Sequence, residues 1–66
     1  MIISPKEVTQ RRVKLGISKA ALAREAGLHP SQLSLIELGR LVPYESQQRK
    51  LADALDRLEK KEENHD

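Results

Sequence analysis

The chain of 66 residues has no cysteine, phenylalanine or tryptophan, and Tyr44 is its only aromatic residue. Without cysteine, neither a disulfide nor a thiolate metal site can support the fold. The core must therefore come from leucine, isoleucine, valine and alanine, and the ten leucines favour helices. No apolar run approaches the ~20 residues that span a bilayer. The first residues also lack the apolar stretch of a signal peptide, so we expect a cytoplasmic protein.

Charge is unevenly distributed along the chain. Residues 1–27 carry six Lys or Arg and two Glu, a net charge of +4, whereas residues 51–66 carry three basic and six acidic residues, a net charge of −3. A polyanionic partner would bind the basic front half. The alternative is that both halves are ordinary solvated surface, and charge alone does not decide between the two.

The apolar spacing predicts helices and no strands, since period-2 alternation is absent. Ser4, Pro5 and Glu7 form the pattern of a capping box with proline at the first helical position. Ser18 is a second candidate N-cap. We expect four helices, with bounds near residues 5–15, 18–26, 30–38 and 44–61. The chain is then one domain, residues 1–61, with a frayed acidic tail over residues 62–66.

The stretch "AREAGLHPSQLSLIELG" places a helix stop and a helix start side by side. Gly27 permits the left-handed conformation that ends one helix. His29 stands where an N-cap belongs, and Pro30 needs no amide partner at the first helical position. The adjacent helix-stop and helix-start signals predict a sharp helix-turn-helix. Leu33 and Ile36 are expected to face inward, with Leu38 as a further candidate.

The segment "GISKAALAREAGLHPSQLSLIELGRLVP" resembles the helix-turn-helix of the Cro and phage-repressor type, the Xre family. Residues 8–55 carry the resemblance. Its matching positions are Arg12, Ser18, Leu22-Ala23, Gly27-Leu28, Leu33, Ile36, Glu37-x-Gly39-Arg40 and Pro43. The resemblance implies an all-α, compact bundle of four to five short helices with the lambda-repressor-like fold. It also implies a small regulator, a repressor of phage or mobile-element type, that binds double-stranded DNA sequence-specifically.

The resemblance further implies which residues meet DNA. The third helix would enter the major groove. Its base-facing residues would be His29, Pro30, Ser31, Gln32 and Leu35. Gln32 could contact adenine with both amide atoms, and Leu35 could pack on a thymine methyl. The alternative for Leu35 is a core or interface position.

Phosphate contacts are expected from the N-terminus of the second helix and from nearby cations. The candidates are Ser18, Lys19, Arg11, Arg12 and Arg40. The alternative for each cation is an ordinary solvated side chain. Arg12 has a second expected role, because it and Glu37 both fall on otherwise apolar helix faces. Two opposite charges on inward faces invite pairing, and the resemblance implies the same structural ion pair.

Members of the family commonly bind palindromic operators as dimers. The corresponding interface here would include Leu41, Val42, Tyr44 and Leu58. Two other functions stay open: the antitoxin of a toxin–antitoxin pair, and a protein-interaction module that docks a partner through the C-terminal helix.

Catalysis and metal binding have no support in the sequence. His29 and His65 are the only histidines, and no Gly-rich phosphate loop or activated nucleophile is recognisable. We expect no enzyme activity, no cofactor and no bound metal.

Overall fold

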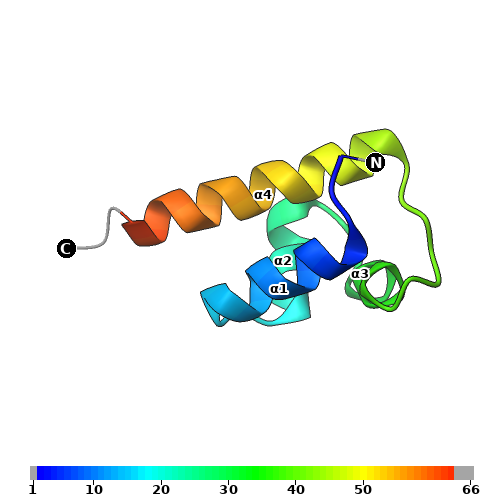
Figure 1. Cartoon of the computed structure of the whole chain (residues 1–66), viewed down its shortest axis with the longest axis horizontal. Coiled ribbons are helices and arrows are strands. Elements are labelled where there is room, and N and C mark those ends of the chain that lie inside the picture. The colour runs from blue at the N-terminus through cyan, green and yellow to red at the C-terminus, as the bar shows by residue number, and fades with distance from the viewer. Residues whose placement is uncertain (1, 64–66) are drawn as a thin grey trace.

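The computed structural model describes residues 2–63, and this part of the chain consists of four α-helices and no strands (Figure 1). The helices are α1 (Pro5–Leu15), α2 (Lys19–Ala26), α3 (Pro30–Glu37) and α4 (Glu45–Glu63). The all-α fold expected from the sequence is confirmed. Helix α4 continues two residues past the expected end at Lys61. The rest of the expected tail, residues 64–66, lies outside the described residues.

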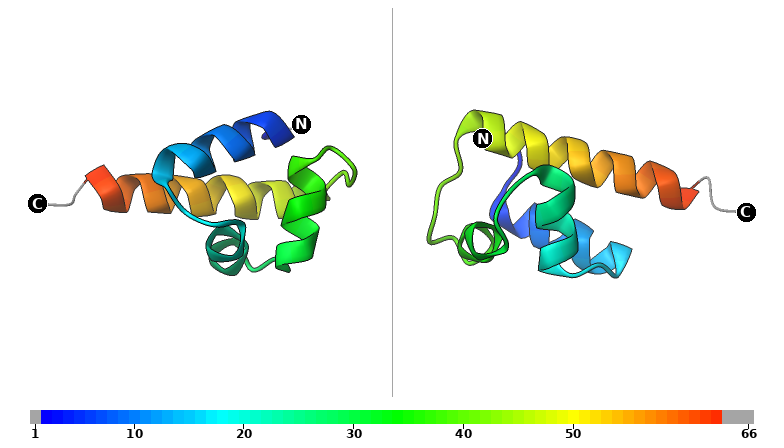
Figure 2. Two further views of the ribbon diagram at one scale, coloured as in Figure 1. Left: turned by 90° about the horizontal axis from the view of Figure 1, so that it is seen from below. Right: turned by 180° about the vertical axis from the view of Figure 1, so that it is seen from behind.

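Helix α4 is the longest element and runs along one side of the molecule (Figures 1 and 2). Helices α1 and α2 both pack against it, and α3 packs against α1 and α2. The C-terminal turns of α4 extend beyond the other helices, so the molecule measures 38 × 19 × 19 Å. Helix α3 and the end of α4 consequently lie at opposite ends of the long axis. None of the helices within residues 2–63 is both long and apolar enough to cross a bilayer.

Local side chains define the start of the first two helices. The Ser4 hydroxyl accepts from the Glu7 amide at 3.1 Å, and the Ser18 hydroxyl accepts from the Ala21 amide at 3.0 Å. Each bond satisfies one of the amides that a helix start leaves unpaired. Only half of the capping box expected at Ser4 forms, because the Glu7 carboxylate pairs with Arg11 one turn later.

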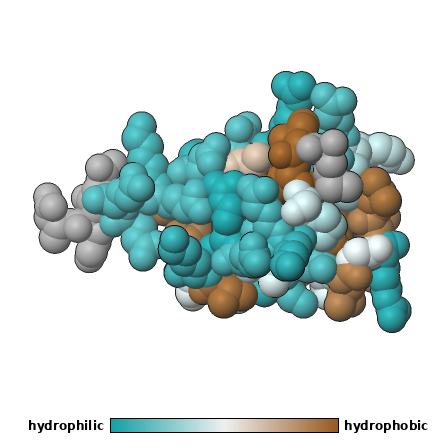
Figure 3. All heavy atoms as spheres, in the orientation of Figure 1, coloured by the Kyte–Doolittle hydropathy of each residue, from teal (hydrophilic) through white to brown (hydrophobic). Residues whose placement is uncertain are grey.

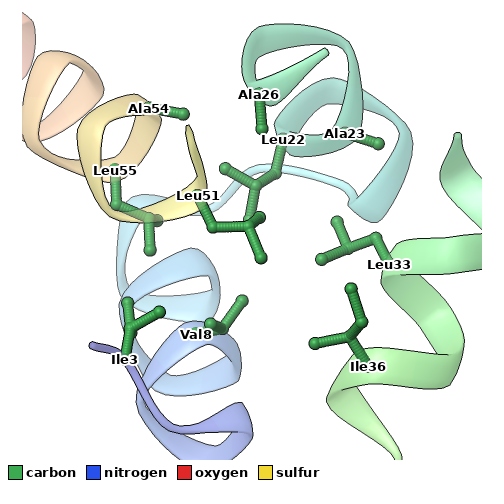
Figure 4. Packing of buried hydrophobic residues seen from close by; sticks show 10 residues of the cluster. All are labelled: Ile3, Val8, Leu22, Ala23, Ala26, Leu33, Ile36, Leu51, Ala54 and Leu55. Carbon is green, nitrogen blue, oxygen red and sulfur yellow. The ribbon is translucent and has the colours of Figure 1, made fainter. Parts of the chain in front are cut away.

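The core lies between the four helices, with α1 and α2 packed against both α3 and α4 (Figure 4). Its fully buried large side chains are Val8, Leu22, Leu33, Ile36, Leu51 and Leu55. The inward positions of Leu33 and Ile36 are as expected, but Leu38 is 63% exposed and the prediction that it faces inward is wrong. Leu38 is the C-cap of α3 and lies on the side of the helix turned away from Leu33 and Ile36.

Gln48 is a buried polar side chain that sequence reasoning missed. Its amide oxygen accepts from the Ile2 amide at 2.8 Å, and its amide nitrogen donates to the Pro43 carbonyl at 3.1 Å. Gln48 thereby joins the N-terminal segment and the α3–α4 loop to the first turn of α4. Both bonds go to backbone groups of chain segments whose proximity the sequence does not reveal.

Candidate nucleic-acid interface

The turn between α2 and α3 spans Gly27 to His29. Gly27 has a φ of 71°, which only glycine adopts at little cost, and the Leu28 amide donates to the Ala23 carbonyl at 2.8 Å. Leu28 is half-buried against the core and fixes the corner. The chain then enters α3 at His29, whose extended backbone leads into Pro30. This geometry is the sharp helix-turn-helix that the sequence predicts.

The first turn of α3 is held by a local hydrogen-bond network. The His29 amide donates to the Gln32 side-chain oxygen at 3.3 Å. The His29 Nδ1 accepts from the Ser31 amide at 3.4 Å and lies 2.8 Å from the Ser31 hydroxyl. His29, Pro30 and Ser31 are exposed, and Gln32 is half-buried. These residues form an ordered first turn of α3, and three of them, His29, Pro30 and Ser31, face solvent.

The outward face of α3 beyond this cap is apolar. Ser31, Leu35 and Leu38 follow one another at i, i+4 and i+7, a spacing that aligns side chains along one face of a helix. Leu35 is 42% exposed, so the alternative that it belongs to the core is wrong. The helix presents one hydroxyl and two leucines in a line, which we call the α3 ridge (Ser31, Leu35 and Leu38).

Positive charge flanks the α3 ridge. Lys19, the first residue of α2, extends its ammonium to 3.4 Å from the Ser34 hydroxyl on α3. Arg40 is exposed just after α3 and makes no ion pair with another residue of the described chain. The Ser18 hydroxyl is engaged in capping, so Ser18 offers the first amides of α2 rather than its side chain. Of the residues expected to contact phosphate, Ser18 and Lys19 thus lie at the start of α2 and Arg40 follows the end of α3.

Arg12 and Glu37 are brought together by the packing of α1 against α3. Arg12 donates from Nε to one carboxylate oxygen of Glu37 at 2.9 Å and from Nη2 to the other at 3.1 Å. The two side chains are only 14% and 4% exposed. Arg12 Nη1 donates to the Ile17 carbonyl at 2.9 Å, and the Thr9 hydroxyl donates to Glu37 at 3.0 Å. These contacts make Arg12 a residue that positions α3, and its predicted phosphate contact stays a prediction.

Arg11, the neighbouring arginine, points to α4 instead of to the candidate interface. Its guanidinium donates to Glu59 at 2.8 Å, to Asp56 at 2.7 Å and to Glu7 at 3.3 Å. The hydrogen bond to Glu59 raises the pKa of Arg11, and the same bond lowers the pKa of Glu59. Three carboxylates surround this charge, and Arg11 ties α1 to α4, so its predicted phosphate contact gains no support from this arrangement.

The residues expected at a dimer interface divide into two kinds. Val42 and Tyr44 are 75% and 77% exposed in the loop between α3 and α4, whereas Leu41 and Leu58 are half-buried against the core of their own chain. Figure 3 shows apolar surface gathered toward the end of the molecule that holds α3 and this loop, while hydrophilic side chains cover the projecting part of α4. Of the four candidates, only Val42 and Tyr44 offer their side chains mainly to solvent.

The acidic part of α4 lies away from α3. Helix α3 and the C-terminal turns of α4 lie at opposite ends of the long axis in Figures 1 and 2. Two of the acidic side chains of α4, Asp56 and Glu59, form ion pairs with Arg11. Within residues 2–63 no group of three or more side chains is arranged to hold a metal ion. His65, the second histidine, lies outside the described residues.

A family model described as a helix-turn-helix domain matches residues 6–63, which include nearly all of α1 and the whole of α2, α3 and α4. Comparisons with curated proteins and with solved structures found no match.

Proposed function

The chain belongs to the helix-turn-helix domain family, and on that premise we propose that it is a small sequence-specific DNA-binding transcriptional regulator. We propose further that it is a repressor related to the Cro and phage-repressor type, the Xre family. Helix-turn-helix domains place the second helix of the motif in the major groove, with its N-terminal residues toward the base edges. In this chain that helix is α3.

The exposed, preordered first turn of α3 is the observation that carries the proposal. His29, Pro30 and Ser31 face solvent, and α3 lies toward the end of the molecule opposite the acidic turns of α4. The Arg12–Glu37 pair holds the other end of α3 against α1. A rigid helix that points its N-terminus outward can enter the groove without rearrangement, which keeps the entropic cost of binding low.

Cations beside α3 can contact the phosphates of the DNA backbone. Lys19 and the free amides at the start of α2 lie on one flank of α3, and Arg40 follows its C-terminal end. Phosphate contacts from such groups fix the position of a protein on the duplex, while base contacts supply the sequence preference. We assign Lys19, Arg40 and the α2 N-terminus to the first task and the outward residues of α3 to the second.

Salt dependence of DNA binding tests the proposal. We expect the affinity for a fluorescent duplex, measured by anisotropy, to fall linearly on a log–log plot against salt, with a slope of about −0.9 per phosphate neutralised. Lys19→Ala should weaken binding to all sequences alike and reduce the magnitude of the slope by about 1. Lys60→Ala, which removes an exposed lysine from the far end of α4, is the matched control and should change neither quantity. Absence of DNA binding by the parent chain at low salt contradicts the proposal.

We also propose that the chain binds a palindromic operator as a homodimer. Val42 and Tyr44 supply exposed apolar surface next to α3, so that two copies joined there would present two α3 helices to the same DNA. Half-sites of such dimers lie ~34–36 Å apart. Selection of bound sequences from a random duplex library should then return an inverted repeat with this spacing. A single unrepeated site contradicts the dimer but not DNA binding.

The α1–α4 end of the molecule favours a second candidate function, a protein-interaction module. Leu15, Ile17 and Leu58 line an open hollow of about 260 Å³ there, bordered by Lys61 and Glu62. An antitoxin would combine this surface with DNA binding through α3, whereas a module that only docks a protein would bind no DNA at any salt concentration. The anisotropy experiment above therefore separates the pure docking module from both kinds of regulator.

A further inference from the structure

We propose that α3 recognises thymine through its methyl group, with Leu35 as the side chain that contacts it. The inference rests on the proposed DNA binding and specifies the chemistry of the target: T·A pairs opposite the middle of α3. In the major groove thymine alone among the four bases presents a C5-methyl group, and apolar side chains pack against it.

The position of Leu35 suits this contact. Leu35 lies one turn after Ser31 on the α3 ridge, about 6 Å further along the helix axis, and is 42% exposed. The Leu35 carbonyl accepts from the amides of Arg40 and Leu41 at 2.9 and 3.3 Å, so the backbone at Leu35 is bonded to the segment that follows α3.

Several hydrogen-bonding atoms near the start of α3 are engaged within the helix cap. Gln32 accepts from the His29 amide, and the Ser31 hydroxyl lies against the His29 ring. Pro30 has no amide proton and no polar side-chain atom. A Gln32 contact to adenine would have to share its oxygen with the helix cap. Methyl recognition by Leu35 needs none of these engaged atoms, so it leaves the N-terminal hydrogen-bond network of α3 intact.

The charge around the α3 ridge favours DNA over a second protein as the group that covers Leu35. Lys19 and Arg40 flank the ridge, and Glu37, the only carboxylate in α3, is buried in its pair with Arg12. A second copy of the chain docked ridge to ridge would bring the same cations together, which is unfavourable. A DNA groove presents methyl groups between two rows of phosphates. The methyl groups can therefore contact the leucines of the α3 ridge while the phosphates contact the cations beside it.

Removal of single methyl groups from DNA tests the inference. A duplex selected by the parent chain from a random library is resynthesised with each thymine replaced in turn by deoxyuridine, which deletes the C5-methyl group and leaves base pairing unchanged. Binding is measured by anisotropy at one salt concentration. We expect about a fourfold loss of affinity at one or two thymines, the factor for ~0.8 kcal/mol from one buried methyl group. For Leu35→Ala we expect those positions to bind equally with thymine or uracil.

Val13→Ala is the matched control, because Val13 is an exposed apolar residue on α1 rather than on α3. It should retain the full preference for thymine. Circular dichroism melts establish that the Leu35→Ala variant is folded, as expected for a partly exposed residue. Sequence-specific binding by the parent chain with no effect of uracil at any position overturns methyl recognition while leaving the proposed function intact. A thymine preference that persists in Leu35→Ala also overturns the assignment. No DNA binding by the parent chain overturns both.

Discussion

Replacing Glu37 by glutamine is the sharpest test of how α3 is held. Glu37 is 4% exposed and accepts from two nitrogens of Arg12 and from the Thr9 hydroxyl. Glutamine keeps the shape and one acceptor oxygen but removes the negative charge, and its amide nitrogen then faces an arginine N–H. Arg12, at 14% exposure, would be left as a largely buried cation without a counter-charge.

The magnitude follows from the burial of the pair. Removing one partner of a buried ion pair costs about 3–5 kcal/mol, because the remaining charge stays desolvated. A domain of this length is stabilised by roughly 3–10 kcal/mol in total. Since 1 kcal/mol shifts the Tm of a small domain by about 4–8 °C, we expect Glu37→Gln to lower the Tm by at least about 12 °C.

Urea unfolding followed by circular dichroism at pH 7 measures the effect. Glu45→Gln is the matched control: Glu45 pairs with Arg49 at 3.0 Å within α4, but both side chains are exposed. That substitution should cost less than about 1 kcal/mol. Equal stability of Glu37→Gln and the parent chain would refute the reasoning that this ion pair braces α3.

Two further predictions concern other parts of the fold. Glu59→Gln removes the main partner of Arg11 and should cost about 0.5–1 kcal/mol at pH 7, a small value because Glu59 is partly solvated. Since folding lowers the pKa of Glu59, its contribution is present above the usual glutamate pKa of ~4.3 and is lost as the pH falls through the folded value, so urea midpoints of the variant and the parent should converge in acid. Gly27→Ala should cost about 1–2 kcal/mol of unfolding free energy, entirely through its φ of 71°, because an added Cβ meets no atom within 4 Å. Gly27→Asn should lose less, since asparagine tolerates this conformation, and an alanine variant as stable as the parent would contradict the explanation.

The sequence was informative wherever neighbouring residues decide the structure. Ser4 and Ser18 mark helix starts because their hydroxyls reach amides three residues away. Gly27 and Pro30 mark the turn because glycine tolerates the left-handed backbone conformation, whereas proline has a fixed φ and no amide proton. The inward faces of α1 and α3 follow from helical periodicity, and this placed Arg12 and Glu37 on facing surfaces.

Periodicity did not distinguish residues near the border between a buried and an exposed face. Leu35 and Leu38 have the same side chain as Leu33, yet both are exposed, because only contacts with α1 and α2 define which arc of α3 is covered. Val42 and Leu41 are adjacent and equally apolar, but one is exposed and the other is half-buried.

The four-helix pattern and the turn at Gly27 follow from the sequence, because they depend on backbone preferences and on bonds between residues a few positions apart. Which of two adjacent arginines braces α3 depends instead on how the helices pack together. Arg11 and Arg12 differ by about 100° around α1, so one meets Glu59 and Asp56 on α4 while the other meets Glu37 on α3. These partners are 25 to 48 residues away along the chain, and their positions depend on how the helices pack together.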